Sequence, residues 1–600
     1  MSKHKESKIN KIIHSWAFWL ILITGIAIII RSIPAWLNAA WGLDFGIYYG
    51  LTNQFVETKE FINPYTGWGS SYQYFPVLYT MTGVLHLITG IEVIEILPKI
   101  APIFGGLVVT VFYFIVKELL NDKKIALLSS ALLAVSVFHV YQTSHAAPLT
   151  AGHFFMMISL YFFIRFEKHP AFSIPLILST ALLIFSHHFT TYFYILSITF
   201  LTFAYISRLK KLNKQSLQIL AYVIFASASA FSYWAFIAKP VYDWFMSGNF
   251  LLPSFVIISL YYVFLAVGIY AALHWDLARS IIKRFTKPLN MQRNKKIVLA
   301  FIVALSLLVI ASILGIPGIQ VKITTLAIIY SLPMLVVLSL SYAGLTRLST
   351  IKNGYLIKGW FVGLFLSLLY SLVAGKLLPD RHFEYLIVPL CIPAAITLTE
   401  ILAEHPIKMH YSVHKLENVF LRIIANNKKS IMVLGFVALL FIANLMITYP
   451  AIESLNTIDE RVSYNNINTF GWMDGNISNT SVIASDHRLE MLLWALGFET
   501  TYGETNVTWI AENFSDCMCE IRDLNISYIL IDDIMRENVV NVDVGKYYHM
   551  TNESYDKFKY QPFELVYRNA TLNQELEETH WVEIYSVDKS YLFDIEEMLL

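Results

Sequence analysis

The stretch AFWLILITGIAIIIRSI, residues 17–33, indicates the fold class of the chain. A helix needs about 20 mainly apolar residues to cross a bilayer, and this run approaches that length with one charged residue near its end. Similar runs recur as far as residue 449 and predict a polytopic α-helical membrane protein of about 13 spans. The candidate spans lie near 17–33, 100–118, 125–142, 149–165, 172–186, 189–206, 217–238, 254–274, 297–315, 325–345, 359–377, 385–402 and 431–449.

The overall composition agrees with this interpretation. The 600 residues are 56% hydrophobic and 14% charged, and the mean hydropathy is +0.55. Soluble globular proteins are typically about 45–50% apolar and about 25% charged, so an ordinary soluble protein is excluded. The formal net charge of +1 also argues against a nucleic acid as the partner. We therefore expect the chain to lie in a lipid bilayer.

Basic residues alternate between the predicted loops and indicate how the spans are oriented. Four lysines precede the first span within the first 11 residues, and every second loop after it is rich in Lys and Arg. Because such loops stay on the cytoplasmic side, the pattern predicts a cytoplasmic N-terminus and an extracytoplasmic C-terminus in the cell membrane. The first outer loop then covers about residues 34–99. Its apolar segment 74–96 is expected to be amphipathic or re-entrant, because a span there would reverse the alternation.

Residues 451–600 differ from residues 1–450 in charge and in glycosylation motifs. They carry 27 of the 43 acidic residues but 9 of the 44 basic ones. They hold seven Asn-x-Ser/Thr sequons, whereas residues 1–450 hold none. We therefore predict a multi-span membrane domain over 1–450 and a soluble extracytoplasmic domain over 451–600, in an organism that N-glycosylates. The sequon asparagines are Asn476, Asn479, Asn506, Asn513, Asn525, Asn552 and Asn569.

The C-terminal region has the pattern of an α/β domain. Runs rich in β-branched and aromatic residues predict strands, and an apolar helical pattern that ends at Gly497 predicts a helix near 488–497. The predicted strands are SVIAS (481–485), SYILID (527–532), FELVY (563–567) and WVEIYSV (581–587).

Polar residues gather at the predicted outer ends of the spans. Each one alone fits an interfacial or capping residue, but together they lie on one predicted face of the membrane. An anionic ligand would need such a set, with Arg to grip phosphate, His as donors and one carboxylate as a base. The candidates are Asp44 in WGLDFGIYYG, His145 and His153 in SHAAPLTAGH, His187 and His188 in FSHHFTTYFY, and Arg381 and Glu384 in LLPDRHFEYL.

The sequence assigns no metal ligand. No HxxH or HExxH pattern occurs, and the predicted outer loop 316–324 contains no acidic residue. The possibility of a divalent metal cofactor therefore stays open, and no residues are assigned to bind it.

The layout of the chain resembles the GT-C superfamily of membrane glycosyltransferases. Within it, APIFGGLVVTVFYFIVKELLNDKKIALLSSALLAVSVFHVYQTSHAAPLTAGHF, residues 101–154, is similar to the second and third spans of the oligosaccharyltransferase catalytic subunit. The resemblance extends over about 10–450 in layout and is sharpest over about 31–165. It implies that Asp44, which matches the first-loop acid of the family, is a catalytic base or orients the acceptor. It also implies that Arg381 binds the lipid phosphate.

The sequence departs from the oligosaccharyltransferase pattern in three motifs. The second acidic motif is replaced by AAPLTAGH, which ends at His153, and the loop that supplies a third metal carboxylate has none. The WWDYG peptide-recognition motif is absent, and GWMDG (471–475) is only distantly similar to it. These departures favour a sister enzyme that uses a polyprenyl-phosphate-linked sugar.

The resemblance therefore predicts a specific reaction. The expected donor is a polyprenyl- or dolichyl-phosphate-linked sugar, and the expected acceptor is a glycan, lipid or protein on the extracytoplasmic face. A single displacement with Asp44 as base would invert the anomeric carbon. Two alternatives stay open at this point. One is an oligosaccharyltransferase-like enzyme of protein N-glycosylation, and the other is a transporter of lipids or glycans that is not an enzyme.

Overall fold

The computed structural model describes residues 15–250, 252–276, 291–315, 323–406, 427–449, 458–543, 546–572 and 578–592. The chain forms two compact units that each combine separate segments. Unit 1 comprises Met1–Arg31, Phe104–Thr143 and Gly152–Pro450, and unit 2 comprises Ser32–Ile103, Ser144–Ala151 and Ala451–Leu600. The predicted first outer loop thus groups with the C-terminal region. The predicted domain boundary after residue 450 stays a prediction.

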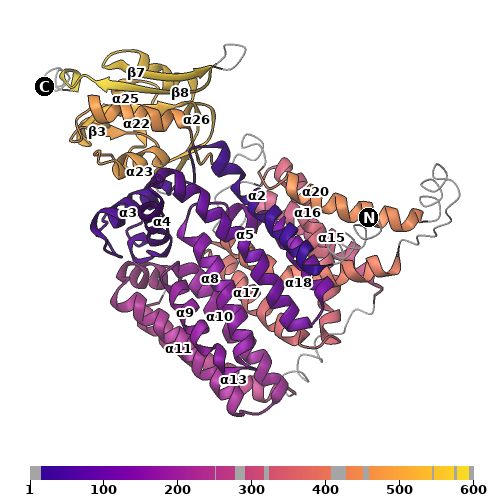
Figure 1. Ribbon diagram of the computed structural model, residues 1–600. Helices are drawn as coiled ribbons and strands as arrows, with labels where there is room; N and C mark the ends of the chain where they lie inside the picture. The colour runs from indigo at the N-terminus through magenta and orange to yellow at the C-terminus, as the bar shows by residue number, and fades with distance from the viewer. Residues whose placement is uncertain are drawn as a thin grey trace, which may run out of the picture. The chain divides into compact units, whose positions relative to one another are not determined.

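Long apolar helices make up most of the chain, as the sequence predicts (Figure 1). Among the described residues, eleven helices are long and apolar enough to cross a membrane, so the chain is a multi-pass membrane protein. They are α2 (Trp16–Leu37), α5 (Val93–Leu120), α8 (Pro148–Phe166), α10 (His188–Leu209), α11 (Lys214–Phe236), α13 (Ser254–Leu273), α15 (Arg293–Leu314), α16 (Thr325–Leu345), α17 (Gly354–Ala374), α18 (His382–Glu404) and α20 (Lys428–Met446).

Two of the predicted spans are shorter than expected. The predicted span 125–142 is divided into α6 (Lys123–Ala134) and α7 (Val137–Gln142), and the span 172–186 is α9 (Ser173–Ile184). A helix of 12 residues is about 18 Å long, less than the hydrocarbon core of about 30 Å. The count of 13 spans therefore stays a prediction.

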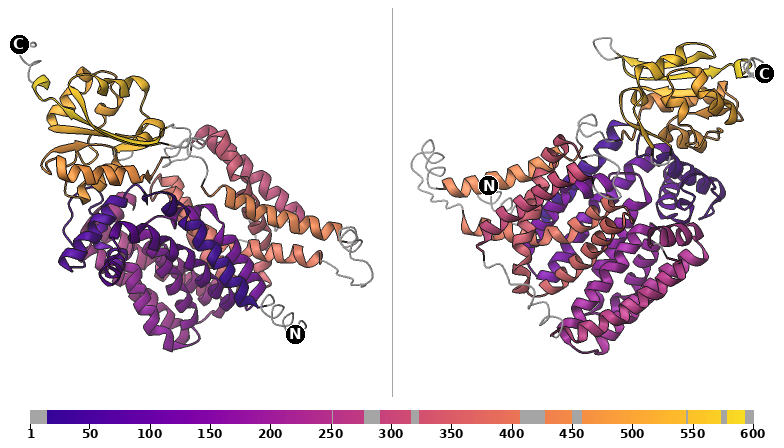
Figure 2. Two further views of the ribbon diagram at one scale, coloured as in Figure 1. Left: turned by 45° about the horizontal axis from the view of Figure 1, so that its top comes forward. Right: turned by 180° about the vertical axis from the view of Figure 1, so that it is seen from behind.

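Within unit 1, α10 is a central helix that packs against α11, α13 and α17. The same helices lie side by side in the views of Figure 2. Small residues permit this approach: a Cβ atom on Gly363 of α17 would lie 2.7 Å from the Phe200 ring of α10. The close packing against α17 therefore fixes the position of α10, the span that begins at His188.

In unit 2, the four strands predicted from the sequence form one sheet in the order β3-β4-β8-β7. Strands β3 (Val482–Ala484) and β4 (Ile526–Asp532) are parallel, and β8 (Glu578–Val587) runs antiparallel to β4 and to β7 (Phe563–Leu572). Figure 1 shows β7 and β8 in yellow at the C-terminal end of the chain. The predicted C-terminal α/β region is thus confirmed. The structure adds the helix α22 (Tyr464–Asn476), which contains the GWMDG segment.

The predicted first outer loop is part of the same unit. Its helix α3 (Phe45–Thr58) packs on α23 (His487–Ala495), and two glycines one helical turn apart allow close contact. A Cβ atom on Gly46 would lie 2.3 Å from the Leu492 nitrogen, and one on Gly50 would lie 2.4 Å from the Trp494 ring. Just before α3, β1 (Ala40–Trp41) pairs with β2 (Arg461–Val462). The segment 74–96 contains a separate helix, α4 (Val77–Thr89).

Candidate functional site

Asp44 lies immediately before α3, at the end of the loop that follows β1. Its side chain does not cap the helix but accepts hydrogen bonds from three other side chains. The hydroxyl groups of Tyr72 and Tyr48 lie 2.9 and 3.3 Å from Oδ2, and the His487 ring nitrogen Nε2 lies 3.1 Å from Oδ1. The Asp44 side chain is 19% exposed. The carboxylate is therefore held in one orientation and still reaches the surface of its unit.

His487 is the donor that the sequence analysis does not predict. It is the first residue of α23, directly after Asp486, whose side chain caps the helix by accepting a hydrogen bond from the Leu489 backbone at 3.1 Å. The imidazole is 3% exposed and meets the Trp68 ring edge-on at a centroid distance of 4.6 Å. Because an ionised carboxylate only accepts, the His487 Nε2 atom carries the hydrogen toward Asp44.

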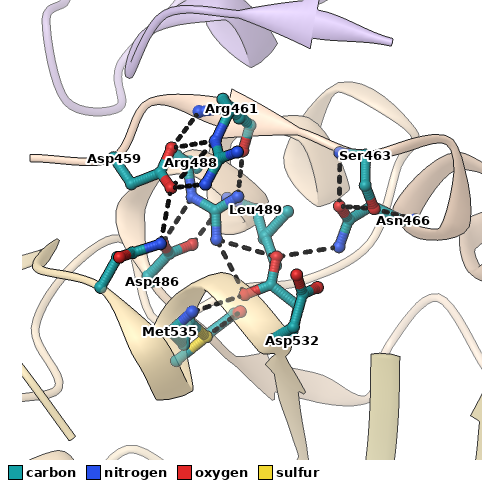
Figure 3. Close-up of polar contacts among 12 residues, drawn as sticks. Asp459, Arg461, Ser463, Asn466, Asp486, Arg488, Leu489, Asp532 and Met535 are labelled. Carbon is teal, nitrogen blue, oxygen red and sulfur yellow. Dashed lines mark hydrogen bonds and ion pairs between the residues drawn. The ribbon is translucent and has the colours of Figure 1, made fainter. Parts of the chain in front are cut away.

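A buried ion network supports the start of α23 (Figure 3). The fully buried Arg488 guanidinium lies 2.7 Å from Asp486 and 2.9 Å from Asp532, and it also donates to the backbone carbonyl of Arg461. Burial lowers the pKa of Arg488, but the two carboxylates outweigh that effect and hold the pKa above its usual value. Arg461 in turn binds the Asp459 carboxylate at 2.9 Å. The network joins β2, β4 and α23.

His145 also belongs to unit 2, where it pairs with Glu460. The His145 Nε2 atom lies 2.5 Å from the Glu460 carboxylate, and its ring lies 5.5 Å from that of Trp41. Gly42, between Trp41 and Asp44, has a φ of +124°, and its backbone nitrogen donates to the Glu460 carbonyl at 3.1 Å. A side chain at this position would disfavour this φ, so a glycine is required here. The backbone hydrogen bond from Gly42 then holds Glu460 beside the loop that carries Asp44.

The other basic candidates lie in unit 1, where His187, His153 and Tyr385 are connected. The His187 side chain caps α10 by accepting from the Thr190 backbone at 3.3 Å, and the Thr190 hydroxyl is 2.8 Å from that of Tyr385. The Tyr385 ring stacks on His153 at 4.5 Å. Burial, followed by the nearby charges of His188, Arg381 and His153, lowers the pKa of His187 well below its usual value. His187 is therefore within electrostatic reach of Arg381 and His153.

Like His187, Arg381 is a partly exposed member of this group. Its side chain is 38% exposed, donates a hydrogen bond to the Gln142 side chain and lies 3.9 Å from the Asp380 carboxylate. His188, next to His187, is buried, and its ring meets that of Phe245 at 5.0 Å. The guanidinium is therefore the cation of the group that a ligand can reach at a surface.

Deeper in unit 1, His153 and Glu384 face each other at 3.8 Å, too far for a hydrogen bond. Both are buried, and neither ring nitrogen of His153 and neither carboxylate oxygen of Glu384 has a hydrogen-bond partner among the described residues. His139 packs against His153 at 5.2 Å, and its Nδ1 atom accepts a hydrogen bond at 2.9 Å from the buried Arg31. Such unpaired buried groups are rare and usually functional within a membrane.

The structure thus divides the predicted site residues into two groups. Arg381, His187, His188, His153 and Glu384 gather in unit 1, whereas Asp44 and His145 lie in unit 2. The sequence analysis misses Arg31 and His139 in unit 1 and His487 in unit 2. Arg31 could have been selected from the sequence as a functional candidate, because it is the single charged residue within the first span.

The residues of these groups do not fit a metal ion. Within the described ranges, no group of three or more His, Cys, Asp or Glu side chains is placed to hold one. The Asp44 oxygens accept from Tyr and His side chains, and His145 is paired with Glu460. We therefore derive no step through a metal ion.

Several solved structures share the fold of the chain at low sequence identity. The Archaeoglobus fulgidus oligosaccharyltransferase in its apo form is 13% identical, with a TM-score of 0.58 over 95% of this chain and 89% of that one. The mycobacterial arabinofuranosyltransferase AftD is 12% identical, with a TM-score of 0.49 over 95% and 40% of the two chains. ArnT from Cupriavidus metallidurans bound to undecaprenyl phosphate is 10% identical, with a TM-score of 0.43 over 94% and 98%.

No family model and no curated protein matches the sequence. At these identities the likeness concerns the fold, and the oligosaccharyltransferase match, which spans nearly all of both chains, carries that conclusion. The chain therefore shares the fold of that oligosaccharyltransferase, which agrees with the GT-C layout that the sequence predicts.

Proposed function

We propose that the chain is a membrane glycosyltransferase that takes a sugar from a polyprenyl-phosphate carrier. The observation that carries the proposal is the Asp44 carboxylate, which three donors orient while its side chain stays 19% exposed. A general base needs this combination, because it must be positioned and must still be reached by the hydroxyl that it deprotonates. The fold of the chain is compatible with this reaction class.

The reaction is a single displacement at the anomeric carbon. Asp44 accepts the proton of the acceptor hydroxyl, whose oxygen forms the new bond to the anomeric carbon. The bond from that carbon to the carrier phosphate breaks, its electron pair goes to the phosphate oxygen, and the configuration inverts. The residues supply orientation and charge stabilisation, and the phosphate itself is the leaving group.

Arg381 is proposed to bind the carrier phosphate. Its partly exposed guanidinium matches phosphate in charge and in geometry, and His187 lies within electrostatic reach of it. His188 and His153 complete the basic group, and the buried Glu384 carboxylate faces His153 at 3.8 Å. His145 supports the loop of Asp44 through Glu460.

The orientation predicted from the loop charges belongs to the same proposal. We place the N-terminus in the cytoplasm, the C-terminal region outside the cell membrane, and the transfer on the extracytoplasmic face. The acceptor is a glycan, a lipid or a protein hydroxyl.

The test uses cell membranes as the source of acceptor and a panel of polyprenyl-phosphate hexoses labelled in the sugar. Membranes that contain the full chain should incorporate label from at least one donor, and the product should have the inverted anomeric configuration. Membranes without the chain are the control. Transfer with retention, or transfer only from nucleotide sugars, would contradict the proposal.

Protein N-glycosylation is the second candidate, because the oligosaccharyltransferase structure matches over 95% of this chain. It predicts transfer of a whole oligosaccharide to the Asn of an Asn-x-Ser/Thr peptide, with dependence on a divalent metal. The same membranes, supplied with a labelled sequon peptide and lipid-linked oligosaccharide, distinguish the two. Glycopeptide formation that EDTA abolishes would select this candidate.

A further inference from the structure

We propose that His487 is a positioning residue for Asp44, supplied by the C-terminal region of the chain; this inference rests on the proposed function. Among the described residues, the Asp44 carboxylate has three hydrogen-bond donors. Two of them, Tyr48 and Tyr72, come from the first outer loop. His487 comes from a segment 443 residues further along the chain.

The arrangement of the donors identifies where the acceptor hydroxyl binds. An ionised carboxylate has about four lone-pair positions, two on each oxygen. The hydroxyl groups of Tyr48 and Tyr72 occupy both positions on Oδ2, and His487 occupies one on Oδ1. The remaining position is on Oδ1, next to the imidazole. The acceptor hydroxyl therefore donates to the Asp44 oxygen that His487 orients.

Two connections fix His487 relative to Asp44, and the buried Arg488 takes part in both. Arg488 binds Asp486, the residue that caps α23 directly before His487. It also donates to the backbone carbonyl of Arg461 in β2, the strand that pairs with β1 three residues before Asp44 (Figure 3). The edge-on contact of Trp68 holds the imidazole itself. The backbone segments that carry Asp44 and His487 therefore share one buried support.

The test compares two substitutions that separate packing from hydrogen bonding. H487F keeps an aromatic ring beside Trp68 but removes the Nε2–H donor, and H487Q restores an amide N–H. H580F is the matched control, because His580 pairs with the Asp533 carboxylate at 2.8 Å in the same region but does not contact Asp44. Each variant is assayed as the full chain, with the labelled polyprenyl-phosphate hexose that the wild type transfers.

We expect H487F to lower kcat about 10- to 100-fold, with KM for the donor within about threefold of the wild type, because a hydrogen bond to a charged group is lost. H487Q should recover most of that loss, and H580F should match the wild type. If H487F has wild-type kcat while D44N is inactive, the inference is wrong and the proposed function stands. An equal loss in H487F and H487Q also overturns it. If D44N is fully active or no donor is transferred, both fail.

A second and independent inference concerns the sequons. We propose that residues 458–572 contain the N-glycan acceptor sites of the chain. None of the seven sequon asparagines is buried. Of the five other described asparagines in the C-terminal region, Asn465, Asn466, Asn538 and Asn541 are buried, and Asn468 is exposed. All seven sequon asparagines thus lie at the surface, whereas four of the five other described asparagines of this region are buried.

The hydroxyl residue of each motif further divides the sites. Thr508 and Ser554 are fully buried, so Asn506 and Asn552 lack an accessible sequon in the folded chain. The hydroxyl residues of the other five motifs are at least partly exposed. An enzyme that recognises the hydroxyl of a folded substrate should therefore modify only those five. They belong to Asn476, Asn479, Asn513, Asn525 and Asn569.

The test is glycopeptide mass spectrometry of the full chain produced in yeast, where sequons are modified outside the cytoplasm. We expect glycan on at least three of the five accessible sites. A Y355T variant creates the matched control sequon at Asn353, in a predicted cytoplasmic loop, and this site should stay unmodified. Seven unmodified sequons, or glycan on Asn353, would overturn the inference. Neither result depends on the enzymatic activity of the chain.

Discussion

The two polar groups of this molecule differ in how completely their hydrogen bonds are made. In unit 2, the Asp44 carboxylate accepts from Tyr48, Tyr72 and His487, and the buried Arg488 binds Asp486, which caps the helix that carries His487. In unit 1, both Glu384 oxygens and both His153 nitrogens are buried without a hydrogen-bond partner among the described residues. One group is fixed by the protein itself, and the other keeps unused donors and acceptors.

This difference corresponds to two chemical tasks. A base that acts on one proton gains from being held in a single orientation before the substrate arrives. A group that binds an anionic ligand needs donors that are still available when the ligand binds. The partly exposed Arg381 guanidinium suits the second task by its charge, and Asp44 suits the first. The following substitutions test whether the two groups differ as proposed.

The largest effect is expected when the buried Arg488 network of unit 2 is disrupted. R488M leaves the buried Asp486 and Asp532 carboxylates without their cation, and breaking a buried pair in this way costs about 3–5 kcal/mol. The melting temperature of unit 2, followed for the full chain in detergent, should fall steeply. R522M, in an exposed pair with Asp523, is the control and should change it little. An unchanged melting temperature in R488M would show that the network is not a support.

The next effect concerns the basic group and should appear in binding rather than in stability. R381A removes the guanidinium proposed to bind phosphate, so KM for the polyprenyl-phosphate donor should rise about 10- to 100-fold. The rate at saturating donor should change less. R347A, which removes an arginine that pairs with Glu400 elsewhere in unit 1, should leave KM unchanged. Equal KM values for R381A and the wild type would refute the phosphate assignment.

A smaller effect should follow from separating α3 and α23. A Cβ atom on Gly46 would lie 2.3 Å from the Leu492 backbone, so G46A forces the helices apart and should cost about 1–3 kcal/mol. It should also lengthen the contact between Asp44 and His487 and lower kcat. G471A is the matched control, because no atom lies within 4 Å of its Cβ position and Ala favours the helix. Full stability and activity in G46A would contradict the role of this contact.

Much of the fold is visible in the sequence, because it depends on local patterns. Each of the four C-terminal strands is a short β-branched run, and Gly497, with a φ of +88°, ends the helix as expected. The division between α6 and α7 is not predictable from composition, since no Pro or Gly marks the break near Ser136. In the site, Asp44 stands out as an isolated acid. His487 does not, because its role depends on a contact across 443 residues.

The most direct measurement compares the same chemical change in the two groups. D44N and E384Q each replace an acid by its amide, and both are assayed by single-turnover transfer from a saturating polyprenyl-phosphate donor. If Asp44 is the base, D44N should lower the rate by about 100-fold or more, because its amide cannot take the proton. E384Q should stay within about tenfold of the wild type, since in this account Glu384 does not take the acceptor proton. A D44N rate within about threefold of the wild type would contradict the account.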